Sequence, residues 1–232
     1  MLEKDAQISP ERIKKELIRT YGAIVEHFNV TRRYPWPETI MFSKIVPKGC
    51  TVLDLGCGNG RNAIYLAKKG HKVIAVDFCP KMIEVARRNA KKAGLEEKIT
   101  FIVADVVNLP LNNSLVDAAL YIATLHHLPS LEERRESIRE LKRVLKGGGL
   151  ALISVWAIES EDYKRHKRYR VGCMEEGDVL VPWKRQADGR IFYRYYHFFA
   201  EEEFRGLVTQ ENLRIVEFFY HAGNHYALLR KV

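Results

Sequence analysis

The N-terminal part of the chain carries apolar residues at helical spacing. The positions of this stripe are Ile13, Leu17, Tyr21, Ile24 and Phe28. Ser9 and Pro10 precede the stripe, and a hydroxyl side chain followed by proline is typical of the start of a helix. The pattern therefore predicts an amphipathic helix that begins at Ser9-Pro10 and ends before Asn29. Two prolines exclude a regular helix through residues 31–37.

From Cys50 onward, short apolar runs alternate with helical stretches. The runs lie at residues 51–55, 72–76, 100–103, 116–122 and 150–156. The helical stretches between them lie at residues 62–69, 80–93 and 131–145. Alternation of this kind predicts a doubly wound α/β fold with a mostly parallel sheet.

The C-terminal part departs from that alternation. A helix is expected at residues 201–208, and two strand-like segments at 213–220 and 225–230 flank a turn. This pattern predicts an antiparallel hairpin at the end of the parallel sheet. The segment 157–199 is long for a connection in such a fold, where roughly two to six residues are common. Because long connections tend to carry function, we expect a substrate-side insertion there.

Composition narrows the class of protein. Of 232 residues, 47% are hydrophobic and 29% are charged, which is typical of a globular chain and excludes a largely disordered one. No stretch without charged residues reaches the roughly 18 residues of a membrane span, and the charged N-terminus lacks the apolar segment of a secretory signal. We expect one cytoplasmic domain over residues 1–232. Its expected parts are an N-terminal helical extension (1–49), a core (50–156), the insertion (157–199) and a C-terminal helix and hairpin (200–232).

Cysteine spacing and net charge add two further expectations. The four cysteines, at positions 50, 57, 79 and 173, form no CxxC pair, so we expect neither a metal site nor a disulfide scaffold. The formal net charge is +9, which makes a polyanionic partner plausible without identifying one.

The most specific motif is the sequence Asp54-Leu-Gly-Cys-Gly-Asn-Gly60 at the end of the first predicted strand. Glycine lets the backbone approach a ligand closely, and the following helix N-terminus offers free N–H groups. A dinucleotide site requires its third glycine one position later, and an acid this close would repel a pyrophosphate. The acid instead suits a ligand that carries an ammonium group. The motif resembles motif I of the class I methyltransferases, which use S-adenosylmethionine.

That resemblance implies a seven-stranded class I methyltransferase (Rossmann-like) α/β fold and S-adenosylmethionine as the cofactor. Asp77 ends the second strand and would bind the ribose hydroxyls, while Phe78 would lie against the adenine ring. Asp105 ends the third strand and would accept the adenine amino group. The expected cofactor-binding residues are Asp54, Gly56, Cys57, Gly58, Asn59, Gly60, Asp77, Phe78, Asp105, Val106 and Ala123.

The residues after the fourth predicted strand narrow the choice of methyl acceptor. Methylation of pyrimidine carbon would need a cysteine nucleophile there, and methylation of an exocyclic adenine nitrogen would need an Asn/Asp-Pro-Pro-aromatic loop. The chain has Ala-Thr-Leu-His126-His127 instead. Oxygen, small-molecule and carboxylate acceptors remain open. For His127, orienting or deprotonating a substrate and capping a local turn are both reasonable interpretations; for His126, capping is favoured.

Five scattered segments indicate a narrower family. They are Thr31-Arg32 with Pro35-Trp36-Pro37, Val155-Trp156-Ala157, Leu180-Val-Pro-Trp183, Arg194-Tyr-Tyr-His197 and Gly223-Asn224. In this order they resemble the tRNA wobble-uridine methyltransferases that esterify 5-carboxymethyluridine. A carboxymethyl group is already anionic at neutral pH, so no general base is required. Desolvation and alignment should then supply most of the rate.

The resemblance implies roles for residues outside the cofactor motif. Candidates for catalysis or substrate orientation are Arg32, His127, Arg194, Tyr195 and His197. Candidates for contact with tRNA are Arg33, Trp36, Lys164, Arg165, Lys167, Arg168, Arg170 and Trp183. Residues 164–170 hold five Lys or Arg in seven positions, although such a run is more often a solvated face.

The family also implies a partner, a small zinc-binding activator protein. In the usual strand order of this fold the third strand lies at an edge, and its segment from Thr100 to Val103 carries no charge or proline. We expect the partner to cover this edge. Two other functions remain open: methylation of a small molecule such as a quinone or carboxylic acid, and RNA binding without catalysis. The family pattern has lysine at the loop position where this chain has Arg61. This departure leaves the identity of the methyl acceptor open.

Overall fold

The computed structural model describes residues 9–169 and 175–232. The helices are α1 (Pro10–Thr31), α2 (Pro37–Ile45), α3 (Arg61–Lys68), α4 (Pro80–Lys92), α5 (Leu131–Val144), α6 (Glu161–His166) and α7 (Glu201–Thr209). The strands are β1 (Thr51–Leu55), β2 (Lys72–Asp77), β3 (Ile99–Val103), β4 (Val116–Ile122), β5 (Leu145–Trp156), β6 (Asp178–Lys184), β7 (Ile191–His197), β8 (Leu213–His221) and β9 (Asn224–Lys231). Short 3-10 turns lie at Glu96–Lys98, Leu125–His127 and Lys167–Tyr169.

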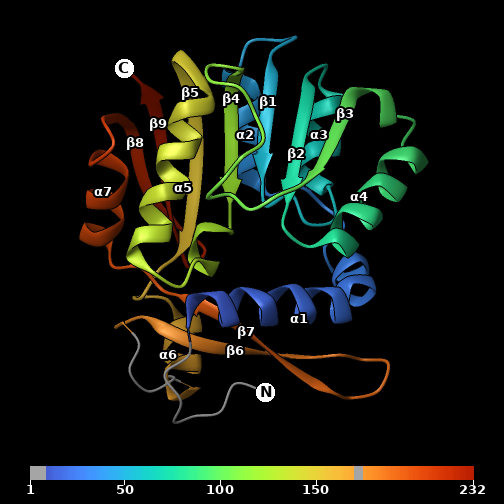
Figure 1. The fold of residues 1–232 in the computed structure, drawn as a ribbon, viewed down its shortest axis with the longest axis vertical. Helices are drawn as coiled ribbons and strands as arrows, with labels where there is room; N and C mark the ends of the chain where they lie inside the picture. Colours follow the sequence, from blue (N-terminus) through green and yellow to red (C-terminus); the bar gives the residue numbers. More distant parts are fainter. Residues whose placement is uncertain (1–8, 170–174) are drawn as a thin grey trace.

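Seven strands form one sheet in the order β3-β2-β1-β4-β5-β9-β8. The strands β1 to β5 are parallel, while β9 runs antiparallel to both β5 and β8 (Figure 1). The expected class I methyltransferase fold, with its mostly parallel sheet and antiparallel C-terminal hairpin, is confirmed. The strand β3 lies at one edge, as the strand order of this fold requires.

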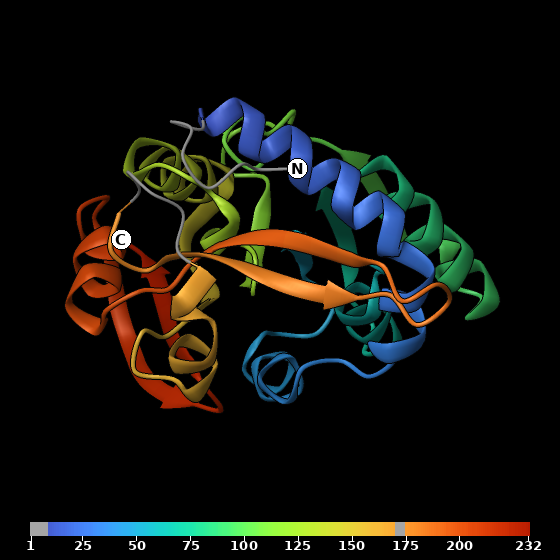
Figure 2. The same cartoon turned by 90° about the horizontal axis from the view of Figure 1, so that it is seen from below.

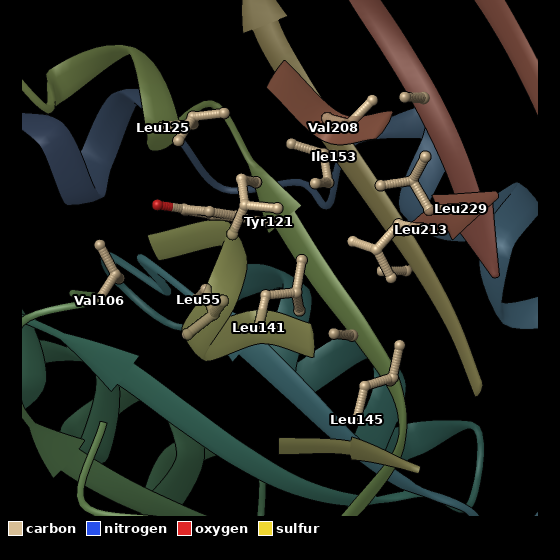
Figure 3. Close-up of a cluster of buried hydrophobic side chains, with 14 of the residues drawn as sticks. Leu55, Val106, Tyr121, Leu125, Leu141, Leu145, Ile153, Val208, Leu213 and Leu229 are labelled. Atoms are coloured by element: carbon tan, nitrogen blue, oxygen red, sulfur yellow. The ribbon is translucent and has the colours of Figure 1, made fainter. Parts of the chain in front are cut away.

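Helices cover both faces of the sheet, which explains why its parallel strands are apolar nearly throughout. On one face, α5 and α7 pack over β1, β4, β5 and β9. Figure 3 shows this core, with Leu141 of α5 and Val208 of α7 facing the strand residues Tyr121, Ile153 and Leu229. On the other face, α2, α3 and α4 pack against the same sheet. The sheet therefore leaves its carboxyl ends as the natural place for a ligand.

The N-terminal helix and the insertion lie across these carboxyl ends. Residues 157–199 form α6 and an antiparallel hairpin of β6 and β7, separate from the main sheet. Figures 1 and 2 show α1 and this hairpin running side by side below the sheet, and α1 contacts both α4 and β7. Together they cover the edge where the glycine loop and the other strand-end loops emerge.

Several element boundaries differ from the sequence predictions. The helix α1 continues to Thr31 because the side-chain oxygen of Asn29 accepts hydrogen bonds from Asn59 and Asn89, and so does not cap its own helix. A helix that the pattern does not predict, α2, begins at Pro37, where the fixed φ of proline suits the first helical position. The strand β5 begins at Leu145, five residues before the predicted start, because it already pairs with Val116 there. Within the described ranges, no helix has the length and apolar character of a membrane span.

Candidate cofactor and methyl-acceptor site

The glycine loop has a backbone that other residues would strain. Gly56, Gly58 and Gly60 have φ of 70°, 54° and 80°, all in the left-handed region. A Cβ at Gly56 would lie 2.0 Å from the hydroxyl oxygen of Thr124, which follows β4. Only glycine therefore allows the loops after β1 and β4 to touch. This contact forms the floor of the site.

A cavity of about 220 Å³ opens above this floor. Its walls come from α1, the segment before α2, the loops after β1 to β4, the end of β5 and the strand β7. Predicted residues that line it are Arg32, Trp36, Gly56, Cys57, Gly58, Asn59, Asp77, Phe78, Asp105, Val106, Ala123, His127 and Arg194. The structure thus brings most of the predicted cofactor residues to one cavity, together with two of the predicted acceptor-side arginines.

Two buried carboxylates lie beside the glycine loop. Asp54 is only 1% exposed, and its Oδ2 has no hydrogen-bond partner among the described residues. Burial raises the pKa of Asp54 to about 7. Asp77 accepts backbone N–H groups from Gly58 and Cys79, both at 2.9 Å, while burial raises its pKa to about 6. Asp77 lines the cavity, whereas Asp54, although predicted to bind the cofactor, does not.

The third acid, Asp105, is held by the N-terminal helix. Lys14 of α1 donates to Asp105 and also forms an ion pair with Glu133 of α5, both at 2.7 Å. The second oxygen of Asp105 accepts the backbone N–H of Val107 at 3.2 Å. Because Lys14 closes this end of the cavity, α1 is part of the wall around the predicted adenine position.

The glycine loop is tied to the segment that comes after α1. Asn59 donates to the backbone carbonyl of Arg32 at 2.8 Å, and Asn62 accepts the backbone N–H of Trp36 at 3.1 Å. Trp36 lines the cavity, and the guanidinium of Arg61 lies 5.6 Å from its ring centroid. The segment around Trp36 is therefore a fixed wall of the site.

The two histidines after β4 are buried and bound to protein groups. Nδ1 of His127 donates to the backbone carbonyl of Tyr195, and Nε2 accepts the hydroxyl of Tyr21, both at 2.8 Å. Burial, together with the charge of Arg194, lowers the pKa of His127 to about 3. Nδ1 of His126 accepts the backbone N–H of Trp156 at 3.4 Å, and burial holds its pKa well below the usual range. His127 therefore joins α1 to β7, with neither ring nitrogen free to act as a base.

Arg194 reaches the acceptor end of the cavity from β7. It is 6% exposed, donates to the hydroxyl of Tyr196 at 2.8 Å, and leaves its Nε without a partner. No carboxylate within the described chain forms an ion pair with it. The ring of Trp183 lies 4.8 Å from Arg194 and 5.4 Å from Arg32, and its indole N–H donates to His27 of α1 at 3.0 Å. Trp183 is thus partly buried between arginines.

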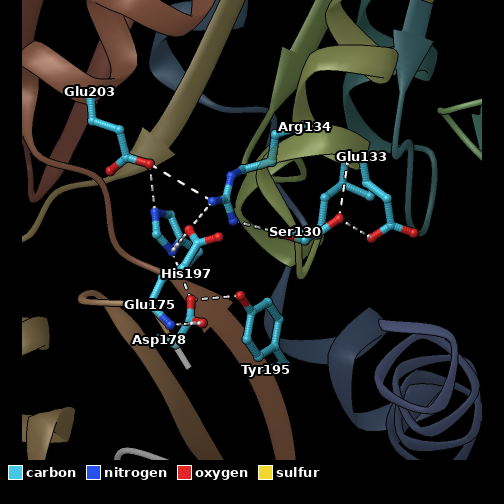
Figure 4. A network of polar contacts seen from close by, with 9 residues as sticks. Ser130, Glu133, Arg134, Glu175, Asp178, Tyr195, His197 and Glu203 are labelled. Carbon is cyan, nitrogen blue, oxygen red and sulfur yellow. Dashed lines mark hydrogen bonds and ion pairs between the residues drawn. The ribbon is translucent and has the colours of Figure 1, made fainter. Parts of the chain in front are cut away.

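The structure does not bring Tyr195 and His197 to the cavity. Successive residues of a strand point to opposite faces, so Arg194 and Tyr196 face the cavity while Tyr195 and His197 face away from it. Asp178 of β6 accepts from the hydroxyl of Tyr195 at 2.6 Å and from His197 at 2.7 Å (Figure 4). These two residues therefore hold the insertion in place at a distance from the reacting groups.

His197 also meets α7 and α5 within this network. Its Nε2 lies 2.8 Å from Glu203, and Arg134 of α5 forms ion pairs with Glu175 and Glu203 (Figure 4). The ligand atoms of Glu175, His197 and Glu203 lie within 4.8 Å of one another, a spacing that a metal ion could use. The buried guanidinium of Arg134 already supplies positive charge to both glutamates, so we assign no metal there.

The predicted basic run is exposed and partly paired. Lys164 and Arg165 of α6 form ion pairs with Glu161 and Asp162 of the same helix, at 2.6 Å and 3.4 Å. Arg168 lies over the ring of Tyr169, whereas Arg170 falls outside the described residues. Arg33, in the segment after α1, is exposed and donates to the backbone carbonyl of Val30.

Sequence reasoning misses several residues that line the cavity. Among them are Lys14, Tyr21, Arg61 and Asn62. Tyr21 also belongs to the apolar stripe of α1, so the sequence pattern does not indicate that its hydroxyl donates to His127.

Comparison with known proteins agrees with this geometry. The model of a methyltransferase domain family matches residues 53–153, which span β1 to most of β5. A solved S-adenosylmethionine-dependent methyltransferase from Methanosarcina mazei superposes with a TM-score of 0.73 at 25% identity, covering 86% of this chain and 99% of that one. A Haloferax volcanii methyltransferase, solved in complex with the Trm112 activator, shares the fold at a TM-score of 0.66 and 17% identity over 93% and 97% of the two chains. Fold and site together define a class I methyltransferase that uses S-adenosylmethionine.

A curated relative identifies the family within that class. The tRNA (carboxymethyluridine(34)-5-O)-methyltransferase of Schizosaccharomyces pombe is 30% identical over 92% of this chain and 95% of its own length. The chain belongs to this family. It spans only 36%, 46% and 25% of the lengths of longer relatives from Arabidopsis thaliana, Macaca fascicularis and Mus musculus.

Proposed function

We propose that this chain methylates the carboxylate of 5-carboxymethyluridine at the wobble position of tRNA, with S-adenosylmethionine as methyl donor. The observation that carries the proposal is the buried guanidinium of Arg194, which pairs with no acid of residues 9–169 and 175–232 and lies at the acceptor end of the cavity. Burying a charge without a counter-ion is costly, so a retained cation of this kind favours an anionic ligand. The names of the relatives point to the same acceptor.

The acceptor carboxylate needs orientation more than activation. Its pKa, near 4, leaves it anionic at neutral pH. Arg194 would hold one carboxylate oxygen, and the aromatic wall of Trp156 and Tyr196, with ring centroids 4.4 Å apart, would exclude water. S-adenosylmethionine supplies an electrophilic methyl group on a sulfonium. The hydrogen bonds that already occupy His126 and His127 are consistent with this chemistry, because no proton has to be removed.

A radiolabelled methyl-transfer assay on bulk tRNA tests this function. Label from S-adenosylmethionine should enter tRNA and be released by mild alkali, because a methyl ester hydrolyses where N-, C- or ether-linked methyl groups persist. Alkali-stable label would show a different acceptor atom. Label that enters only a quinone or carboxylic acid would establish the alternative, a small-molecule methyltransferase. Binding of the cofactor without any transfer would indicate an RNA-binding subunit.

The exposed basic run is proposed to contact tRNA phosphates. Neutralising Lys164, Arg165, Lys167 and Arg168 together should weaken tRNA binding. The slope of log affinity against log salt should fall by roughly 0.7 for each phosphate that no longer binds a cation. Lys164 and Arg165 are paired with acids of their own helix, so the Lys167-Arg168 pair should account for most of the change. Filter binding from low to moderate salt measures the slope, with neutralised Lys91 and Lys92 of α4 as the control; an unchanged slope would contradict this interaction.

The edge strand β3 is proposed to bind a small zinc-binding activator of the Trm112 type. Val103 at its end is 50% exposed, and Thr100 is exposed as well. Unpaired strand edges are available for strand addition. Val103→Lys should abolish capture of a co-expressed activator, whereas Val216→Lys should not, because Val216 is 46% exposed on β8 at the opposite edge. A chain that is monomeric and fully active alone would refute the partner.

A further inference from the structure

His126 lies in the wall of the cavity, beside the residues of the acceptor end. It follows β4, and its ring stacks on the ring of Tyr196 with the centroids 4.7 Å apart. Both residues line the cavity, as do Arg194 of β7 and Trp156 of β5. Only 1% of His126 is exposed, so a ligand meets its ring from inside the cavity. A hydrogen bond from this ring to a ligand is therefore made at the acceptor end.

The hydrogen bond at Nδ1 decides which ring nitrogen of His126 carries the proton. Nδ1 lies 3.4 Å from the backbone nitrogen of Trp156, and an amide N–H can only donate. Nδ1 is therefore unprotonated. Burial, followed by the proximity of His127 and Arg194, lowers the pKa of His126 well below its usual value, so the ring is neutral. A neutral imidazole has one N–H, and the proton must then lie on Nε2.

The N–H at Nε2 of His126 is one of several donors at the acceptor end. The protein does not enclose this nitrogen completely, and no described residue binds it. The Nε of Arg194 is also without a partner within the described chain. The hydroxyl oxygen of Tyr196 accepts from Arg194 at 2.8 Å, so its own proton must be donated elsewhere. The acceptor end thus offers two N–H groups and one O–H group to a ligand.

A carboxylate suits these three donors better than a neutral group of the same shape. Its two oxygens have roughly four lone-pair sites and carry no proton. A carboxamide has only one such oxygen, and its NH₂ group would direct further protons at the donors of the site. A buried donor that stays unpaired costs binding free energy. The acceptor end should therefore discriminate against a carboxamide that has the same outline as the acceptor.

We propose that His126 binds the acceptor carboxylate through its Nε2–H, beside Arg194, and that this neutral donor makes the site select a carboxylate over a carboxamide. The inference rests on the proposed function and names a residue that touches its substrate. A neutral donor holds one carboxylate oxygen while neutralising less of its charge than a second arginine would, so the other oxygen remains nucleophilic. His126 acts here as a donor only, and no proton is transferred.

Two substitutions separate the roles of the two ring nitrogens. In His126→Asn, the side-chain oxygen can still accept the backbone N–H of Trp156, but the amide is too short to reach the position of Nε2. This variant should lower kcat/KM for methyl transfer to tRNA about 10- to 100-fold, as expected when a hydrogen bond to a charged group is removed. In His126→Gln the amide nitrogen reaches further and should recover part of the rate. Titration calorimetry should show that both variants keep their affinity for S-adenosylmethionine within about threefold.

A pair of anticodon stem-loop RNAs tests the selectivity directly. The two RNAs are identical except at C5 of the wobble uridine, where one carries a carboxymethyl group and the other a carbamoylmethyl group. Without S-adenosylmethionine, so that nothing is transferred, the original chain should bind the carboxylate RNA at least about tenfold more tightly. His126→Asn should reduce this ratio, and His126→Gln should restore part of it. His71→Asn is the matched control and should keep the ratio, because His71 is also 1% exposed but does not line the cavity.

The outcomes distinguish this role of His126 from the proposed function. If the original chain methylates tRNA but His126→Asn changes neither the ratio nor kcat/KM, His126 only accepts the backbone N–H of Trp156 and the proposal is wrong. Equal weakening of both RNAs by His126→Asn would show that the ring is a wall of the cavity and not a donor to the carboxylate. If the original chain transfers no alkali-labile label to tRNA, the proposed function and this role are overturned together.

Discussion

Replacing Arg194 by methionine should lower kcat/KM for tRNA methylation by roughly 30- to 1,000-fold, while the affinity for S-adenosylmethionine changes little. Removing one partner of a buried, hydrogen-bonded charge pair costs about 2–4 kcal/mol, and each 1.36 kcal/mol corresponds to a factor of about ten. The loss should fall on the RNA substrate because Arg194 lies at the acceptor end of the cavity. Steady-state kinetics with tRNA and calorimetry with the cofactor measure the two effects separately.

The stability of the Arg194→Met protein distinguishes function from folding. Arg194 is a buried cation without a counter-ion in the part of the chain that the structure describes, so its removal should leave the thermal unfolding midpoint unchanged or higher. Arg205→Met is the control, since Arg205 lies 3.7 Å from the ring centroid of Phe218, pairs with Glu201 and is outside the cavity. That variant should keep full activity. A large loss of stability in Arg194→Met, with activity falling in proportion, would show that Arg194 has a structural role only.

The central sheet can be predicted from the sequence because its signals are local. Apolar runs of strand length alternate with helical stretches, and the structure places strands and helices there with shifts of a few residues. The glycine loop is equally predictable, since the left-handed backbone at Gly56, Gly58 and Gly60 needs that residue type. The predicted element boundaries are less accurate where they depend on hydrogen bonds between strands that are distant in the sequence. The start of β5 depends on pairing with the distant residue Val116, which periodicity does not contain.

The sequence predicts the parts of the candidate site that depend on backbone geometry, such as the glycine loop. It predicts less well which charged side chains pair with one another. The motif Arg194-Tyr-Tyr-His197 suggests one catalytic group, but a strand divides it between two faces. Asp178, which binds Tyr195 and His197, does not stand out in the sequence because a lone acid within an insertion has no pattern. The pairing of Lys164 with Glu161 likewise emerges only from the folded arrangement.

Replacing Asp178 by asparagine should lower the free energy of unfolding by about 3–5 kcal/mol at pH 6, the cost of leaving a buried charge without its partner. Asp178 and His197 are each 1% exposed, and the two ring nitrogens of His197 face Asp178 and Glu203. A neutral imidazole has only one N–H, so both hydrogen bonds require the charged form. Urea unfolding measures the loss. Glu161→Gln, which removes an exposed acid paired with Lys164, should have little effect and serves as the control.

The size of this loss should depend on pH in a defined direction. Burial alone would lower the pKa of His197, but hydrogen bonds to Asp178 and Glu203 raise it above its usual value. Protonation of His197 therefore stabilises the folded state fully below about pH 6.5, and this contribution disappears as the pH rises through the raised pKa. The raised pKa values of Asp54 and Asp77 affect both proteins alike and cancel in the comparison. The difference between Asp178→Asn and the original chain should thus be smaller at pH 9 than at pH 6. An equal difference at both values would mean that His197 is not charged in the folded protein, and that Asp178 acts as a hydrogen-bond acceptor alone.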